Sequence, residues 1–167
     1  MRGTLLFVAD TLRRELKQNR PFRSPAQEGL IAIVRTSDQL RRVLERVIDV
    51  QGITGQQFNV LRILRGAAPD PLPVLEIGER MIEEAPGITR LLDRLEAKGL
   101  VSRARCLKDR RQVHCRITSE GLDLLKLLDA PVSAAEEAVM KPIGRAGQQQ
   151  LIGLLDRLRA GSPVSQK

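Results

Sequence analysis

Hydrophobic positions recur every three to four residues along most of this chain, which is the spacing of one face of an α-helix. The spacing predicts helices over residues 4–18, 27–50, 55–66, 73–82, 86–98, 120–140 and 145–160. Thr54 and Ser119 stand where they could cap the third and sixth helices, and Gly99 stands where it could end the fifth. The fourth helix is expected to contribute to the core through Leu75, Ile77, Met81 and Ile82.

A different pattern follows the fifth predicted helix. Across residues 113–118, apolar Val113, Cys115 and Ile117 alternate with polar residues, as expected of a strand that is buried on one face. A second short strand is expected over 100–106, and the residues between the two strands form a charged turn. The predicted fold class is therefore mainly α with a small β-hairpin.

Positive charge is concentrated around this hairpin. The chain carries 28 lysines and arginines against 20 acidic residues, a net charge of +8. Residues 86–118 hold nine of the basic residues and three of the acidic ones, which gives +6, whereas residues 119–167 hold six of each. A local basic excess predicts a polyanionic partner. Because the chain has no Trp or Tyr, stacking of single-stranded bases is disfavoured, and duplex DNA fits better.

Other classes of protein find little support in the sequence. No apolar run approaches the roughly 20 residues that span a bilayer, and two cysteines make no disulfide framework, so a cytoplasmic protein without a membrane partner is expected. His114, the single histidine, and Cys115 point to opposite faces of their strand, which disfavours a metal site or a Cys–His catalytic pair. We therefore expect no enzyme activity, no metal and no cofactor.

The fifth predicted helix has one apolar face and one polar face. The apolar face has the spacing of a buried stripe and consists of Ile88, Leu91, Leu92 and Leu95. Thr89, Arg90 and Arg94 lie on the opposite face, where they could contact bases or phosphates in the major groove. Pro86 opens the helix, and Gly87 would let backbone amides approach a phosphate closely. The alternative is an ordinary surface helix with an intrahelical ion pair.

The charged turn of the hairpin favours the first interpretation. Lys108, Arg110 and Arg111 project from the turn, and an arginine at a hairpin tip fits the negative potential of the minor groove. Asp109 is expected to orient a neighbouring arginine through a charge-assisted hydrogen bond rather than to contact DNA. A helix, a turn, a second helix and a basic hairpin in this order indicate a winged helix-turn-helix.

The run from Leu72 to Gly121 resembles the MarR family of bacterial regulators. The strongest pieces are GITRLLDRLEAKGLV (87–101), DRR (109–111) and ITSEG (117–121). The resemblance implies a dimerisation helix (25–53), the winged helix-turn-helix (54–121) and C-terminal dimerisation helices (122–160). The hydrophobic pattern adds an N-terminal amphipathic extension (1–24), and composition predicts a disordered tail (161–167). Two departures from the family pattern are Gly78, where alanine is usual, and the run Ala85-Pro86-Gly87, where small hydroxyl residues are more frequent.

The resemblance also implies a function. It implies a homodimer that binds a pseudo-palindromic operator in double-stranded DNA, usually as a repressor that a small aromatic ligand or an oxidant relieves. Thr89, Arg90 and Arg94 would read the major groove, Arg111 would enter the minor groove, and Asp109 would be the structural partner of the wing. The apolar faces of the terminal helices need a partner, which independently favours a dimer over the alternative that they pack within one chain: Leu5, Val8, Leu12, Leu151, Leu154, Leu155 and Leu158.

Two alternatives remain open. Cys106 and Cys115 are expected on the two wing strands at equal distances from the turn, where they could face each other and form a disulfide that re-aims the wing. Such a protein would be a redox-responsive regulator of the same fold. In the second alternative, the chain is a helical adaptor whose basic hairpin meets an acidic protein or a membrane surface.

Overall fold

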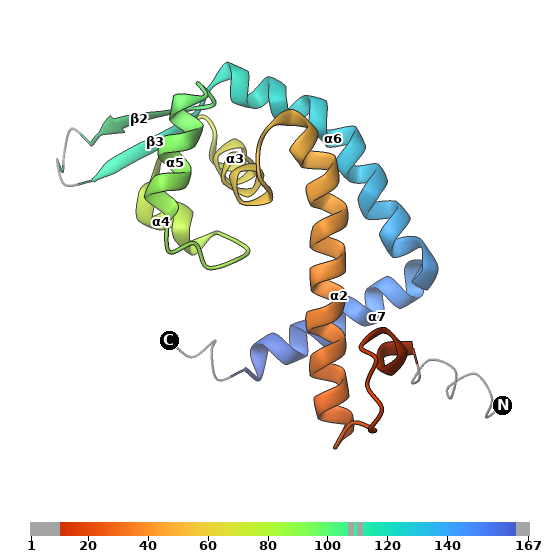
Figure 1. The fold of residues 1–167 in the computed structure, drawn as a ribbon. Helices are drawn as coiled ribbons and strands as arrows, with labels where there is room; N and C mark the ends of the chain where they lie inside the picture. Colours follow the sequence, from red (N-terminus) through yellow and green to blue (C-terminus); the bar gives the residue numbers. More distant parts are fainter. Residues whose placement is uncertain (1–10, 107–108, 110–111, 163–167) are drawn as a thin grey trace. The chain divides into compact units, whose positions relative to one another are not determined.

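The computed structural model describes residues 11–106, 109 and 112–162, and contacts divide the chain into two units, one up to Arg42 and one from Val43 onward. In the first unit, residues 11–15 are helical and the chain turns at 16–17, so the described part of the helix predicted over 4–18 is shorter than expected. Helix α2 (Pro25–Ile48) begins in this unit and is followed by the 3-10 turn η1 (Asp49–Gln51), which ends at Gly52 with a positive φ of 71° (Figure 1).

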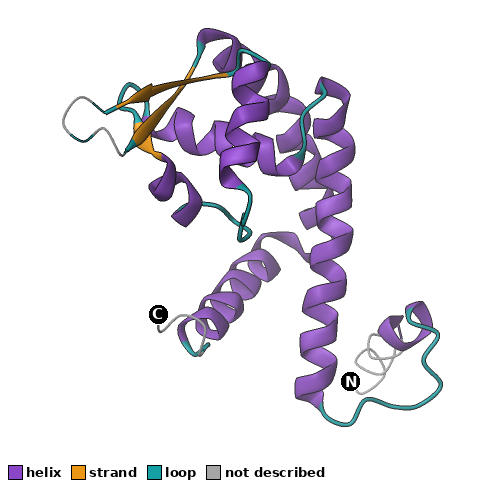
Figure 2. Ribbon diagram, turned by 60° about the vertical axis from the view of Figure 1, so that its left-hand side comes forward, coloured by secondary structure: helices purple, strands orange, loops and turns teal. Residues whose placement is uncertain are grey.

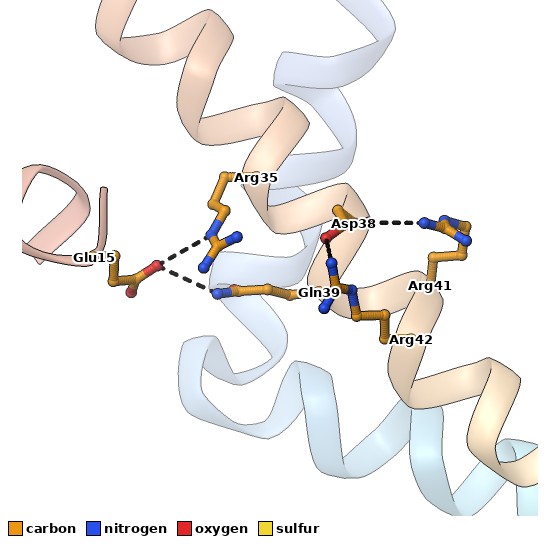
Figure 3. Close-up of polar contacts among 6 residues, drawn as sticks. All are labelled: Glu15, Arg35, Asp38, Gln39, Arg41 and Arg42. Carbon is orange, nitrogen blue, oxygen red and sulfur yellow. Dashed lines mark hydrogen bonds and ion pairs between the residues drawn. The ribbon is translucent and has the colours of Figure 1, made fainter. Parts of the chain in front are cut away.

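Polar contacts hold the N-terminal segment against α2 within the first unit (Figure 3). The Glu15 carboxylate accepts a hydrogen bond from Nε2 of Gln39 at 3.3 Å and lies 3.6 Å from Nε of Arg35. On the same helix, Asp38 pairs with Arg41 at 2.7 Å and with Arg42 at 2.9 Å. These arginines, chiefly Arg41 through its hydrogen bond, hold the pKa of Asp38 below its usual value.

The second unit contains the hairpin and the helices around it. Its helices are α3 (Gly55–Ala67), α4 (Val74–Glu79), α5 (Ile88–Ala97), α6 (Ser119–Met140) and α7 (Gly144–Ala160), with the short η2 (Lys141–Ile143) before the last. The strands β2 (Val101–Arg105) and β3 (Val113–Ile117) pair in antiparallel fashion (Figure 2). The mainly helical fold with a β-hairpin is therefore confirmed.

A third strand extends the expected hairpin into a small sheet. Strand β1 (Leu72–Pro73) pairs with β3, so that the strand order is β1-β3-β2 and Leu72 lies opposite Cys115. The helix predicted over 73–82 was therefore placed too early and extended too far, because it is limited to Val74–Glu79. Proline has no backbone N–H to donate to a neighbouring strand. Pro73 can nevertheless belong to β1, because β1 is an edge strand and pairs on one side only.

The core lies in the second unit and is built of aliphatic side chains with one phenylalanine and one cysteine. Its fully buried members come from α3, α4, α5, β2, β3 and α6: Val60, Leu61, Leu64, Ile77, Leu92, Leu95, Val101, Cys115, Leu125 and Leu128. Ile77 confirms part of the prediction for the fourth helix. Leu75 and Ile82 contradict it, because they are 75% and 79% exposed. Met81 is partly buried against the core, as predicted, whereas Ile82 lies beyond the end of the six-residue helix.

Helix caps fix where the helices of this unit begin. Thr54 caps α3 as predicted: its side chain accepts a hydrogen bond from the Gln57 amide, while the Gln57 side chain accepts one from the Thr54 amide. The predicted cap of α6 was wrong by one residue. Thr118, not Ser119, has the extended backbone of an N-cap, and its hydroxyl accepts a hydrogen bond from the Gly121 amide at 3.1 Å.

Candidate nucleic-acid interface

Helix α5 separates its apolar and polar residues as the sequence predicts. Leu92 and Leu95 are fully buried, and Ile88 and Leu91 are half-buried beside them. Three polar residues of the opposite face are exposed, namely Thr89, Arg90 and Arg94. The helix is therefore anchored along one side by aliphatic packing and presents two guanidinium groups on the other.

The start of α5 is open. Gly87 is the N-cap and forms no side-chain cap, and Pro86 before it is exposed. A Cβ atom added to Gly87 would meet no heavy atom within 4 Å, so the fold itself does not require a glycine here. A helix start with no side chain over it suits the approach of a phosphate to backbone amides.

An arginine from the hairpin pairs with the acidic residues of α5. Arg103 of β2 lies 2.7 Å from Asp93 and donates two hydrogen bonds to Glu96, at 2.8 and 2.5 Å. These contacts, chiefly the hydrogen bond to Glu96, raise the pKa of Arg103 above its usual value. The alternative of an intrahelical ion pair therefore has no support at Asp93, whose partner comes from another element.

Sequence reasoning missed Arg103 because the contact joins two elements. Asp93 and Glu96 are three residues apart on one face of a helix, and Arg103 falls on the inward side of its strand, opposite buried Cys115. The helical pattern places the two acidic residues on one face, and the strand pattern places Arg103 on the inward side. Only the two patterns together predict a contact between Arg103 and the acidic residues.

The basic residues of segment 86–118 fall into three groups. Three of them serve the fold: Lys98 and Arg116 donate to the backbone carbonyls of Gly52 and Pro69, and Arg103 binds α5. A second group, Arg90, Arg94 and Arg105, is exposed. The third group, the predicted wing-tip residues Lys108, Arg110 and Arg111, lies outside the described residues. Part of the local charge excess is thus structural rather than available to a polyanion.

Asp109 and Gln112 are the described residues of the turn. The Gln112 amide donates to the backbone carbonyl of Asp109 at 3.0 Å, and its side-chain amide donates to the Asp109 carboxylate at 3.3 Å. The backbone pairing of the hairpin also extends one residue beyond β2, because the Cys106 amide donates to the Gln112 carbonyl at 3.0 Å. These contacts join Asp109 to Gln112, and the predicted role of Asp109 in orienting a neighbouring arginine stays a prediction.

The two cysteines do not face each other. The register pairs Cys115 with Arg103, while Cys106 lies beside Gln112, just beyond the end of β2. The expectation of a facing pair is therefore wrong, because it assumed that the hairpin turns midway between the two cysteines. Cys115 is fully buried, and burial raises the pKa of its thiol from 9.0 to about 11. A thiol with that pKa is poorly reactive at neutral pH.

This difference between the cysteines gives a simple expectation. In the native protein at pH 7.5, a thiol reagent such as DTNB should modify about one cysteine per chain quickly, because Cys106 is half-exposed and Cys115 is buried. Both should react after unfolding in guanidinium. The Cys106→Ser variant should lose the fast reaction, and a fast reaction that survives in this variant would contradict the burial of Cys115.

The base of the hairpin is held by close backbone contacts. The Thr118 hydroxyl donates to the carbonyl of Gly99 at 2.7 Å, and the Thr118 amide donates to the carbonyl of Leu100 at 3.2 Å. Gly121, in the first turn of α6, lies against the same segment: a Cβ atom there would stand 2.4 Å from the Leu100 oxygen and 2.7 Å from Ile117. Gly99 itself has a φ of 70°, as a glycine that ends a helix should.

Other kinds of site are not evident in the part of the chain that the structure describes. Within residues 11–106, 109 and 112–162, no group of three or more His, Cys, Asp or Glu side chains could hold a metal ion. In the same ranges, every helix is too short or too polar to span a membrane. The residues that stand out are those of α5 and the hairpin.

Comparisons with known proteins bear on this arrangement. The sequence model of the MarR family matches residues 51–112. The chain is 28% identical over 128 residues to the HTH-type transcriptional regulator FarR of Neisseria gonorrhoeae. The matched region covers 77% of this chain and 86% of FarR.

Solved structures give a similar result. A MarR transcription factor from Planctomyces limnophilus is 36% identical, with a TM-score of 0.64, over 81% of this chain and 98% of that one. A mutant MarR from E. coli complexed with operator DNA is 26% identical, with a TM-score of 0.70, over 76% and 90% of the two chains. In both cases most of the other protein is matched.

Proposed function

The chain belongs to the MarR family of transcriptional regulators, and from this we propose that it represses transcription as a homodimer bound to a pseudo-palindromic operator. As a member of this family it is a DNA-binding regulator and not an enzyme. The observation that carries the proposal is the exposed face of α5, on which Thr89, Arg90 and Arg94 stand opposite the buried leucines.

The residues of this face suit different parts of a DNA duplex. Arg90 lies in the first turn of α5 and is assigned to a guanine edge in the major groove, because a guanidinium matches the O6 and N7 acceptors of guanine. Thr89 is assigned to a base or a phosphate, and Arg94, one turn further along, to a phosphate. The open start of α5 at Pro86 and Gly87 leaves room for a second phosphate.

The hairpin supplies the wing of the proposed complex. Lys108, Arg110 and Arg111 are assigned to the DNA backbone and the minor groove by their place in the family pattern, and this assignment rests on sequence alone. Asp109 holds the turn. Half-exposed Cys106 has no role in this proposal.

Unpartnered apolar faces support the homodimer. In α7, Leu151, Leu154 and Leu158 share one face of the helix and are 37%, 51% and 56% exposed. In α2, Leu30 and Val34 are exposed to a similar degree. Apolar stripes of this kind favour burial against a partner, and a second copy of the chain also brings a second α5 to the DNA.

Relief of repression completes the proposal. On the basis of the family resemblance, we assign the role of effector to a small aromatic acid, whose binding would release the protein from its operator. Phe58 of α3 is buried in the core of the second unit, so this aromatic side chain is not assigned to such a ligand. An operator complex that salicylate or benzoate leaves intact at millimolar concentration would remove this part of the proposal without affecting DNA binding itself.

Selection of bound duplexes from a random pool tests the function directly. The expected product is a pseudo-palindrome whose half-sites lie about 10 base pairs apart, bound by two chains as measured by native mass spectrometry. Affinity for the selected duplex should fall steeply as salt rises and should survive competitor DNA. Enrichment of no motif, with salt-dependent binding to any polyanion, would instead favour the basic adaptor.

A further inference from the structure

Arg103 joins the two elements that the proposed function brings to DNA. It belongs to β2, whereas both of its partners, Asp93 and Glu96, belong to α5. Its three nitrogen atoms are all engaged: Nε and Nη2 bind Glu96, and Nη1 binds Asp93. The Arg103 side chain is only 23% exposed, so that water competes for these contacts less than at an open surface pair.

The geometry of the guanidinium makes this contact directional. Asp93 and Glu96 are one helical turn apart, and a planar group with donors along three sides can bind both carboxylates at once. A lysine ammonium could satisfy the charge but would not fix the angle between the helix and the strand. The contact therefore constrains orientation as well as distance.

The position of Arg103 along β2 determines what it constrains. It lies in the middle of the strand, opposite Cys115, and the strand ends at Arg105. In the proposed complex, the minor-groove arginine follows β2 in the sequence, so a rotation of β2 relative to α5 would change how that arginine meets the DNA.

We propose that Arg103 is a positioning residue for DNA binding, which holds the wing at a fixed angle to α5 so that both elements contact one operator together. This inference rests on the proposed function. Arg103 itself contacts no DNA in this scheme. Because the wing is already held in place before binding, less conformational entropy is lost when the complex forms.

A simpler role for Arg103 would be to neutralise acidic residues near DNA. Asp93 is exposed on α5, four residues after Thr89, where its carboxylate would repel phosphates. The two roles make opposite predictions for a variant that lacks both acids. If charge alone matters, Asp93→Ala/Glu96→Ala should bind DNA more tightly, because two negative charges are removed. If Arg103 positions the wing, the variant should bind more weakly.

The experiment compares four forms of the full chain on the selected duplex: wild type, Asp93→Ala/Glu96→Ala, Arg103→Lys, and a control, Asp123→Ala/Asp156→Ala. The control removes two exposed acids of α6 and α7 that pair with Lys126 and Arg159, and so matches the charge change. We expect roughly three- to thirtyfold weaker binding for the first two variants. The control should bind as tightly as wild type or slightly more tightly.

Two further measurements separate positioning from general stability. The slope of log affinity against log salt should become shallower in the first two variants, because wing phosphates are lost although Arg103 contacts none. Melting temperatures should change only modestly, since the acidic partners Asp93 and Glu96 are themselves 51% and 39% exposed and such ion pairs contribute little to stability. Tighter or unchanged binding by Asp93→Ala/Glu96→Ala would overturn the inference. Failure of the wild type to select any duplex would instead overturn the proposed function.

Discussion

Replacing Arg90 and Arg94 together by alanine is expected to abolish selective binding of the operator while leaving the fold intact. Each arginine that contacts a base edge or a phosphate contributes about 1–3 kcal/mol to binding, and a dimer loses the contacts in both half-sites. Both side chains are exposed on α5, and alanine is a good helix former, so folding should not suffer. Fluorescence anisotropy with the selected duplex measures the loss.

A matched control separates recognition from charge. Arg46→Ala/Lys126→Ala removes the same charge from exposed positions on α2 and α6, and it should weaken binding only slightly and without loss of sequence preference. The two single variants divide the roles. Arg90→Ala should relax the preference at one base of each half-site, whereas Arg94→Ala should mainly reduce the salt slope. Wild-type affinity in the double variant, with an unchanged circular dichroism spectrum, would remove α5 as the recognition element.

Periodicity sufficed to predict the helices that carry this site. The apolar stripe of α5 and the alternation in β3 are local patterns, so they can be read from a single sequence. Caps are equally local, which is why Thr54 was identified correctly. At α6 the cap is Thr118 rather than the predicted Ser119; both residue types form caps, and only the path of the chain as it leaves β3 distinguishes them.

The errors share a different physical origin. Strand β1 has two residues and is defined by its pairing with β3, far along the chain, so no local pattern could indicate it. The expected cysteine register is wrong for a related reason, because the pairing of β2 with β3, which places Cys115 opposite Arg103, is a contact between two strands and not a pattern within either one. The bridge at Arg103 also joins separate elements. Contacts between elements, rather than the elements themselves, are what the single sequence left undetermined.

Gly121 illustrates such a contact and leads to the largest expected effect on stability. Replacement of Gly121 by alanine is expected to destabilise the fold by about 1–3 kcal/mol, because the new Cβ atom would overlap a neighbour that cannot move aside easily. That neighbour is a backbone oxygen of Leu100, 2.4 Å from the ideal Cβ position, and the side chain of Ile117 is only slightly further away. The clash would push the first turn of α6 away from the base of the hairpin.

Gly78→Ala is the matched control, since it makes the same change inside another helix of the same unit. A Cβ atom at Gly78 meets no heavy atom within 4 Å, so there the substitution should stabilise the protein by about 0.5–1 kcal/mol through the lower backbone entropy of the unfolded chain. Guanidinium unfolding followed by circular dichroism measures both at one protein concentration, which matters if the chain dimerises. Shifts of the same sign in the two variants would mean that helix propensity, rather than the close approach at Leu100, determines the outcome. Opposite shifts, with operator affinity also reduced in Gly121→Ala, would link the base of the hairpin to the position of the wing.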